Sequence, residues 1–153
     1  MLFSGRQSGT ISRMKRAVLD TCILTAGLRS RQGASFAVLS NLADGQFQAL
    51  VTTALFLEYE AVLKRPEQRA VHGLDVDGID GLLGELAAIL VPVEVRFTWR
   101  PQLSDPADEM VLEAAVNGRA DALVTHNVRD FAAAARFGIP VLRPAEFLRG
   151  GAT

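Results

Sequence analysis

The feature that most constrains the fold is the regular alternation of short apolar runs with longer segments of helical periodicity. The apolar runs predict buried strands at residues 15–20, 47–53, 89–95, 122–125 and 140–142, and Pro92 favours an edge strand or a break in the third of them. The segments between them predict helices at residues 35–43, 54–64, 77–90, 105–117 and 129–137, with a terminal turn at 145–148. Strands that alternate with helices favour a parallel sheet covered on both faces. We therefore expect an α/β domain of three α/β/α layers around a central, mostly parallel sheet.

The length and composition fit one globular domain. The chain has 153 residues, of which 49% are hydrophobic and 22% charged, which is enough for one continuous core. We expect that domain to span residues 14–149, after a disordered leader or extension at residues 1–13 and before a flexible tail at residues 150–153. No apolar run reaches the roughly 18 residues of a membrane span, and none forms a signal-peptide core. We therefore expect a cytoplasmic protein without a membrane partner.

Cysteine content and net charge limit the cellular compartment and the kind of substrate that we expect. The single cysteine, Cys22, excludes an intramolecular disulfide, fits a reducing compartment and is expected to be a small packing residue. The formal net charge of −1 gives no general attraction to nucleic acid. A polyanionic substrate would therefore have to be held by local arginines and a bound metal.

Acidic side chains are predicted to gather at one edge of the sheet. In open parallel sheets, ligands bind beyond the carboxyl ends of the strands. Positions in or next to such strand ends and helix starts are occupied by Asp20, Glu58, Asp105, Asp108, Asn127 and Asp130. Carboxylates brought together in this way repel one another, and a hard divalent cation with oxygen ligands relieves that repulsion. The pattern predicts a metal site suited to phosphodiester hydrolysis.

Each acidic residue also has a plainer interpretation when it is taken alone. Asp20 could begin a turn, and Glu58 could lie on a solvated helix face. Asp105 could be a helix cap, and Asp108 could favour the helix dipole. Asp130 could be a turn or cap residue. The joint placement of these residues, and not any one of them, carries the metal hypothesis.

Four sequence segments resemble the motifs of PIN-domain nucleases, especially bacterial PIN-family toxins of the VapC type. In chain order they are AVLDTCIL, VTTALFLEYEAVL, SDPADEMVLEAA and ALVTHNVRDF, and the resemblance extends from Met14 to about Leu148. It implies a PIN-like fold and catalytic, metal-binding roles for Asp20, Glu58 and Asp108 with Mg²⁺ or Mn²⁺. Asn127 stands where many members of the family carry aspartate. Its amide oxygen can still bind a metal but adds no charge, so Asp130 could supply the missing carboxylate.

The resemblance also implies a function and partners. It implies an endoribonuclease that acts as the toxin of a toxin–antitoxin pair, with RNA as substrate, a cognate antitoxin protein and a homodimer. Thr21 and Thr125 would lie near the metal and orient a ligand or phosphate. Arg29 and Arg65, in loops after the first and second motifs, are candidates for phosphate contacts, although solvated surface charge is the default for such residues.

Other functions remain open. The substitution at Asn127 would also fit a catalytically weakened PIN scaffold that binds RNA or protein. A different Mg²⁺ phosphohydrolase on a similar sheet is a further alternative, and DNA is not excluded as a substrate.

Overall fold

The computed structural model describes residues 14–98 and 100–150. In chain order its elements are β1 (Arg16–Leu19), α1 (Thr21–Arg29), α2 (Ala34–Ala43), β2 (Gln48–Val51), α3 (Thr53–Leu63), α4 (Pro66–His72), α5 (Val76–Ile89), β3 (Val91–Pro92), α6 (Pro106–Asn117), β4 (Ala122–Val124), the 3₁₀ segment η2 (Val128–Phe137), β5 (Val141–Leu142) and α7 (Pro144–Leu148). The leader expected at residues 1–13 and most of the expected tail lie outside the described residues. No helix among the described residues is long and apolar enough to cross a membrane.

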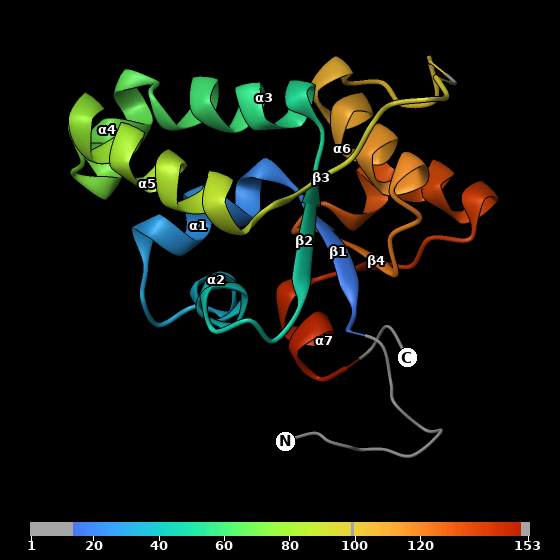
Figure 1. The fold of residues 1–153 in the computed structure, drawn as a ribbon, viewed down its shortest axis with the longest axis horizontal. Helices are drawn as coiled ribbons and strands as arrows, with labels where there is room; N and C mark the ends of the chain where they lie inside the picture. Colours follow the sequence, from blue (N-terminus) through green and yellow to red (C-terminus); the bar gives the residue numbers. More distant parts are fainter. Residues whose placement is uncertain (1–13, 99, 151–153) are drawn as a thin grey trace.

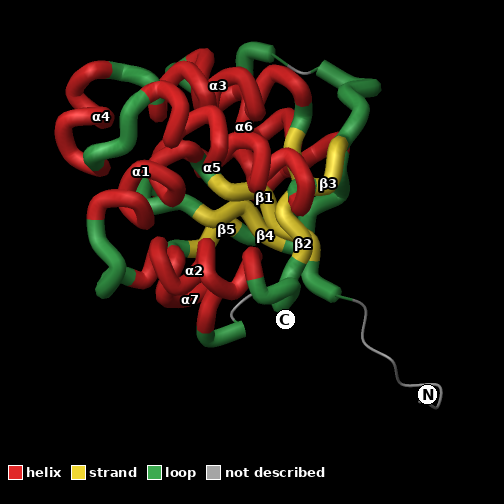
Figure 2. Tube along the Cα trace, turned by 60° about the vertical axis from the view of Figure 1, so that its left-hand side comes forward, coloured by secondary structure: helices red, strands yellow, loops and turns green. Residues whose placement is uncertain are grey.

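The strands form one parallel sheet in the order β3-β2-β1-β4-β5. The first strand lies at its centre, where Ala17 pairs with Ala49 of β2 on one side and Ala122 of β4 on the other. Helices α3 and α6 cover one face of the sheet and α2 and α7 the other (Figures 1 and 2). The predicted three-layer α/β fold is therefore confirmed, with every described strand pair parallel.

The central strands are buried on both faces of the sheet. Val18, Leu50 and Leu123 have no exposed side-chain surface. A parallel strand that is buried on both faces reads as a continuous apolar run, which is why the sequence located these strands well. The third run narrows to Val91–Pro92 at the sheet edge, as Pro92 predicts, because proline cannot donate a ladder hydrogen bond.

Two helices were not predicted from the sequence. Helix α1 begins directly after Asp20, but its β-branched residues weaken the helix pattern. As a result Arg29, expected in a loop, is instead the last residue of α1. Helix α4 is a short helix with Pro66 at its first turn, so the proline that ends α3 also begins α4. Arg65 precedes this helix, as the residue before its first turn.

Candidate functional site

Asp20 is a buried carboxylate at the junction of the two central strands. It follows β1, it is 6% exposed, and its backbone N–H donates to the Val124 carbonyl at the end of β4 (2.9 Å). Asp20 is also the N-cap residue of α1, yet its side chain makes no capping hydrogen bond. An aspartate at this position ordinarily caps the helix. Here the carboxylate is held by other partners.

Both hydrogen bonds to the Asp20 side chain end on the same oxygen. Thr125 Oγ1 donates to Oδ2 at 2.7 Å, and Cys22 Sγ donates to Oδ2 at 3.3 Å. Among the described residues no hydrogen bond reaches Oδ1, and this atom is not one of the buried unpaired atoms. The arrangement fixes the orientation of the carboxylate and leaves Oδ1 for a ligand.

Thr125 connects Asp20 to the loop that follows β4. Its buried hydroxyl donates to Asp20 and accepts the backbone N–H of Asn127 at 2.9 Å. Asn127 is exposed, and as the N-cap residue of η2 it makes no side-chain capping bond. Among the described residues, the Asn127 side-chain amide therefore makes no capping hydrogen bond, although its backbone is bonded to the threonine that holds Asp20. Next to it, His126 Nε2 lies 2.7 Å from Ser35 Oγ, which ties this loop to α2.

Tyr59 fastens α3 to the end of β1. Its hydroxyl donates to the Leu19 carbonyl at 2.6 Å, and the side chain is 2% exposed. Burial first, and then the charge of Asp20, raise the pKa of Tyr59 far above its usual value. Tyr59 is thus a neutral donor that holds the helix carrying Glu58, and sequence reasoning did not identify it.

Asp108 shows that the acidic side chains act on one another. It lies half-buried in the first turn of α6. Burial, followed by the charges of Asp20, Asp105, Asp130 and Glu109, raises its pKa from 3.8 to about 6. Carboxylates from three segments that are distant in the sequence therefore share one electrostatic environment.

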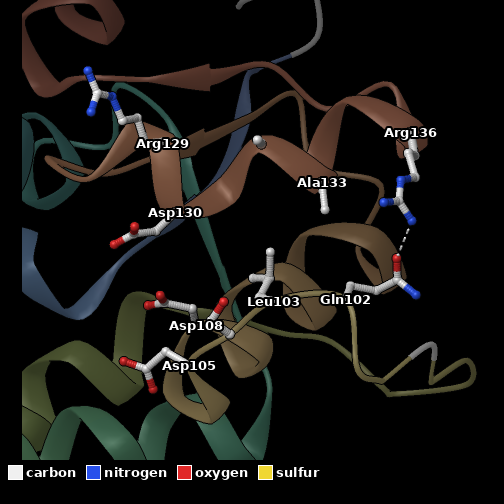
Figure 3. Close-up of a pocket in the computed structure, with 10 residues that line it drawn as sticks. Gln102, Leu103, Asp105, Asp108, Arg129, Asp130, Ala133 and Arg136 are labelled. Carbon is white, nitrogen blue, oxygen red and sulfur yellow. Dashed lines mark hydrogen bonds between the residues drawn. The ribbon is translucent and has the colours of Figure 1, made fainter.

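Three of these acids line an open pocket of about 510 Å³ between α6 and η2. In Figure 3 the side chains of Asp105, Asp108 and Asp130 gather at one end of it. Asp105 also accepts the backbone N–H of Ala107 at 2.9 Å, so the interpretation of this residue as a helix cap is confirmed. Asp130 is exposed in the first turn of η2.

One wall of the pocket is held by a second buried acid. Glu109 is 5% exposed, and its Oε1 accepts the backbone N–H groups of Gln102 (2.5 Å) and Leu103 (2.6 Å). Farther along α6, Glu113 forms a two-pronged ion pair with Arg100, at 3.0 and 3.1 Å. The segment before α6 is therefore fixed against that helix, and with it the pocket wall.

Glu58 is less closely connected to the other acids than the sequence suggested. It is half-buried on α3, which packs against α6. Within the described ranges it forms no ion pair, and it is not among the charges that raise the pKa of Asp108. The neighbouring Glu60, by contrast, pairs with Lys64 at 2.8 Å. A metal-binding role for Glu58 stays a prediction.

The remaining candidate residues lie away from this pocket. Thr21 is buried as the first residue of α1, while Arg29 and Arg65 are exposed. The arginines that do line the pocket are Arg129 and Arg136 of η2, which sequence reasoning missed. Their closeness in sequence to Asp130 was the one signal that could have found them.

The donor atoms of the site suit a hard divalent cation, since they are carboxylate, amide and hydroxyl oxygens. Burial, and then repulsion by the neighbouring carboxylates, raise the pKa of Asp108, and a cation would relieve the repulsion. However, no group of three or more His, Cys, Asp or Glu residues within 14–98 and 100–150 is already arranged to hold a metal ion. The chemistry of the donor atoms therefore fits Mg²⁺ or Mn²⁺, but the side chains would have to move to coordinate the cation.

Together, the fold and the site define an all-parallel α/β domain with an acidic pocket beside the carboxyl ends of its central strands. The chain belongs to the PIN domain family, whose model matches residues 16–129. The predicted family resemblance is therefore confirmed.

Two solved structures have a similar fold. One is FitAB bound to an IR36 DNA fragment, with 16% identity, a TM-score of 0.53, and coverage of 84% of this chain and 94% of that one. The other is VapBC2 from Rickettsia felis bound to a DNA fragment from its promoter, with 16% identity, a TM-score of 0.57, and coverage of 84% and 98%. No curated protein matches the sequence significantly. At this identity the likeness shows the fold alone.

Proposed function

We propose that this protein is a metal-dependent endoribonuclease that hydrolyses RNA phosphodiester bonds and acts as the toxin of a toxin–antitoxin pair. The observation that carries the proposal is the gathering of Asp105, Asp108 and Asp130 at one end of an open pocket, where burial and then the charges of Asp20 and the neighbouring acids raise the pKa of Asp108 to about 6. Structural ion pairs usually lower the pKa of an acid, whereas this cluster is destabilised until positive charge arrives. Membership of the PIN domain family supports the nuclease class.

Asp20 and Asp108 would hold Mg²⁺ or Mn²⁺, with Asp130, Asn127 and Glu58 as further ligands. A cation in this position supplies two things: activation of a water and neutralisation of charge on the phosphate. Thr125 keeps Asp20 oriented, because its hydroxyl occupies Oδ2 and leaves Oδ1 open. Asp108 is mostly ionised at neutral pH, because its pKa of about 6 lies below 7.

The proposed partners follow from the family. The two similar structures, FitAB and VapBC2, are both bound to DNA, and in VapBC2 the DNA is a fragment from the promoter. For this chain we propose a cognate antitoxin protein, a homodimer and a cytoplasmic location. Thr21, Arg29 and Arg65 stay candidates for substrate contacts, although none of them lines the acidic pocket.

A catalytically weakened PIN scaffold that binds RNA or protein is the second candidate. Two features favour it: Asn127 stands where many members of the family carry aspartate, and no set of three metal-binding residues is preformed in the described part of the chain. The two candidates differ in metal dependence, because a scaffold has no use for a cation in this pocket.

The deciding experiment is cleavage of a random-sequence single-stranded RNA by the purified protein with Mn²⁺, with Mg²⁺ and with EDTA. We expect cleavage with either metal, no cleavage in EDTA, and a rate at least about a hundredfold lower in Asp20→Asn and Asp108→Asn. Asp44→Asn, which makes the same change at an exposed residue after α2, is the matched control and should retain full activity.

The outcomes separate the candidates. Full activity in either site variant, or activity that EDTA does not change, would reject the metal mechanism. RNA binding without cleavage under all conditions would favour the scaffold. A parallel assay with single-stranded DNA decides whether the sugar matters.

A further inference from the structure

The acidic pocket has a second end that differs in chemistry from the first. In Figure 3 the carboxylates of Asp105, Asp108 and Asp130 lie at one end, and Arg136 with Gln102 closes the other. Between them lie Leu103 and Ala133, and Ala132 also lines the pocket. The pocket therefore passes from negative charge, across small apolar side chains, to a guanidinium group.

Arg136 is placed by a bond that leaves most of its donors available. Its Nη1 donates to Gln102 Oε1 at 2.9 Å, and the residue is exposed in the last turn of η2. A guanidinium presents several N–H donors in a planar fork that matches the oxygens of a phosphate. The bond to Gln102 uses one of these donors and orients the rest.

The opposite wall is rigid for a reason that sequence patterns did not reveal. Glu109 accepts the backbone N–H groups of both Gln102 and Leu103 and is buried beneath them. Gln102, which orients Arg136, and Leu103, which forms the apolar middle, are thus fixed to the helix that carries Asp108. Gln102 and Leu103 therefore keep a fixed position relative to Asp108, and a preformed site costs less conformational entropy on binding.

We infer that Arg136, oriented by Gln102, binds the phosphate that adjoins the scissile one, with the intervening ribose and base against Leu103 and Ala133. The inference rests on the proposed function, which places the scissile phosphate at the carboxylates. A pocket of about 510 Å³ is in the size range of a small-ligand site, so its volume suits a single nucleotide. Proteins commonly read single-stranded RNA by taking unstacked bases into pockets of this kind.

The overall charge makes this contact important. With a net charge of −1 the protein does not attract RNA in general. A phosphate held in the pocket therefore depends on the few cations that line it, which are Arg129 and Arg136. Arg129 is exposed and directly precedes Asp130, whereas Arg136 lies at the end away from the acids. Arg136 is the better candidate for the neighbouring phosphate.

The test measures RNA binding in a background that does not cleave. Asp108→Asn and the double variants Asp108→Asn/Arg136→Gln, Asp108→Asn/Arg136→Lys and Asp108→Asn/Arg149→Gln are titrated with a fluorescent random-sequence single-stranded RNA in Mn²⁺, over a range of salt concentrations. Arg149 is an exposed arginine after α7 and serves as the matched charge control. Thermal unfolding of each variant confirms that it is folded.

We expect Arg136→Gln to weaken RNA binding about tenfold, because a charge-assisted phosphate contact is lost. The slope of log affinity against log salt should fall in magnitude by about 0.7, the value for one phosphate on a single strand. Arg136→Lys should restore the salt slope but only part of the affinity, and Arg149→Gln should change neither. In the cleaving protein, Arg136→Gln should raise KM much more than it lowers kcat.

The inference is overturned if Arg136→Gln binds as tightly as its background, or if Arg149→Gln shows the same loss. Failure of the nuclease proposal gives a different result: the protein with Asp108 intact would not cleave RNA, while the binding comparison would still decide the role of Arg136.

Discussion

Thr125 Oγ1 lies 2.7 Å from Asp20 Oδ2, and this side-chain hydrogen bond joins the ends of strands β4 and β1 in addition to the backbone bond from Asp20 to Val124. The threonine is fully buried and the aspartate nearly so. A carboxylate in such surroundings needs a donor, since an unpaired buried charge is costly. The same bond therefore contributes to stability and sets the orientation of the proposed metal ligand.

Replacing Thr125 by valine keeps the side-chain shape and removes this donor. We expect the free energy of unfolding to fall by about 2 kcal/mol, because the bond is buried and charge-assisted. The rate of Mn²⁺-dependent RNA cleavage should fall about tenfold, as is typical when the partner of a metal ligand is lost. Urea unfolding and the cleavage assay measure the two effects. Thr125→Ser keeps the hydroxyl and should behave nearly as the wild type; equal losses in both variants would contradict the assignment.

The raised pKa of Asp108 predicts how stability depends on pH in the metal-free protein. The folded-state value of about 6 exceeds the ordinary 3.8, so between these values the native state binds more protons than the unfolded state. The contribution of Asp108 to the free energy of unfolding is therefore most favourable below about pH 4, and this contribution is lost as the pH rises through 6.

The substitution Asp108→Asn removes the charge, and with it the loss of stability at neutral pH. In EDTA at pH 7.5 we expect the variant to be more stable than the wild type by about 1 kcal/mol, after discounting the shift for partial solvent exposure. At pH 3.5 the advantage should be much smaller, because the aspartate is then protonated in both states. Urea unfolding at the two pH values checks this, and a variant that is less stable at pH 7.5 would show that Asp108 is not under repulsion.

Asn127→Asp tests whether the amide belongs to the metal site. The change adds negative charge beside Asp20 and Asp130, so we expect Mn²⁺ affinity to rise about tenfold and stability in EDTA to fall. Isothermal titration with Mn²⁺ and unfolding in EDTA measure the two effects. Asn41→Asp on α2 makes the same change away from the pocket and should alter neither the affinity nor the heat of binding. If both aspartate variants bind Mn²⁺ as the wild type does, position 127 is not a ligand.

Tyr59 offers a spectroscopic prediction, because it is the only tyrosine in the chain. Its pKa is raised by burial and by the charge of Asp20, so the phenol should stay neutral in the folded protein at pH values where a free tyrosine ionises. Ultraviolet absorbance during alkaline titration should show phenolate only as circular dichroism reports unfolding. Phenolate formation well below the unfolding pH would mean that the hydroxyl is not held by Leu19.

The sequence was most informative where one physical signal dominates. Strands such as β1 and β4 are buried on both faces, so their apolar runs locate them without further context. Asp20 and Asp130 follow the adjacent parallel strands β1 and β4, so topology alone places these two residues at the same edge of the sheet. Asp108 follows no strand and lies instead in the first turn of α6, the helix that leads into β4.

The rest of the site depends on contacts between distant segments, which no local pattern encodes. Glu109 looks like an ordinary first-turn glutamate, and only the folded chain places two backbone N–H groups against it. In the sequence Arg136 resembles an ordinary surface charge, and only the fold of η2 shows that it donates a hydrogen bond to Gln102. Helix α1 was hidden because its weak local propensity is overridden by the burial of Ile23 and Leu24.

The buried thiol of Cys22 can report on local opening of the fold. Burial, and then the charge of Asp20, raise its pKa to about 12, so at neutral pH it is a protonated donor with almost no nucleophilic thiolate. As the chain's sole cysteine, it should resist alkylating reagents while the native fold lasts. The rate at which an alkylating reagent modifies Cys22, measured by mass spectrometry, therefore reports how often the strand ends open transiently.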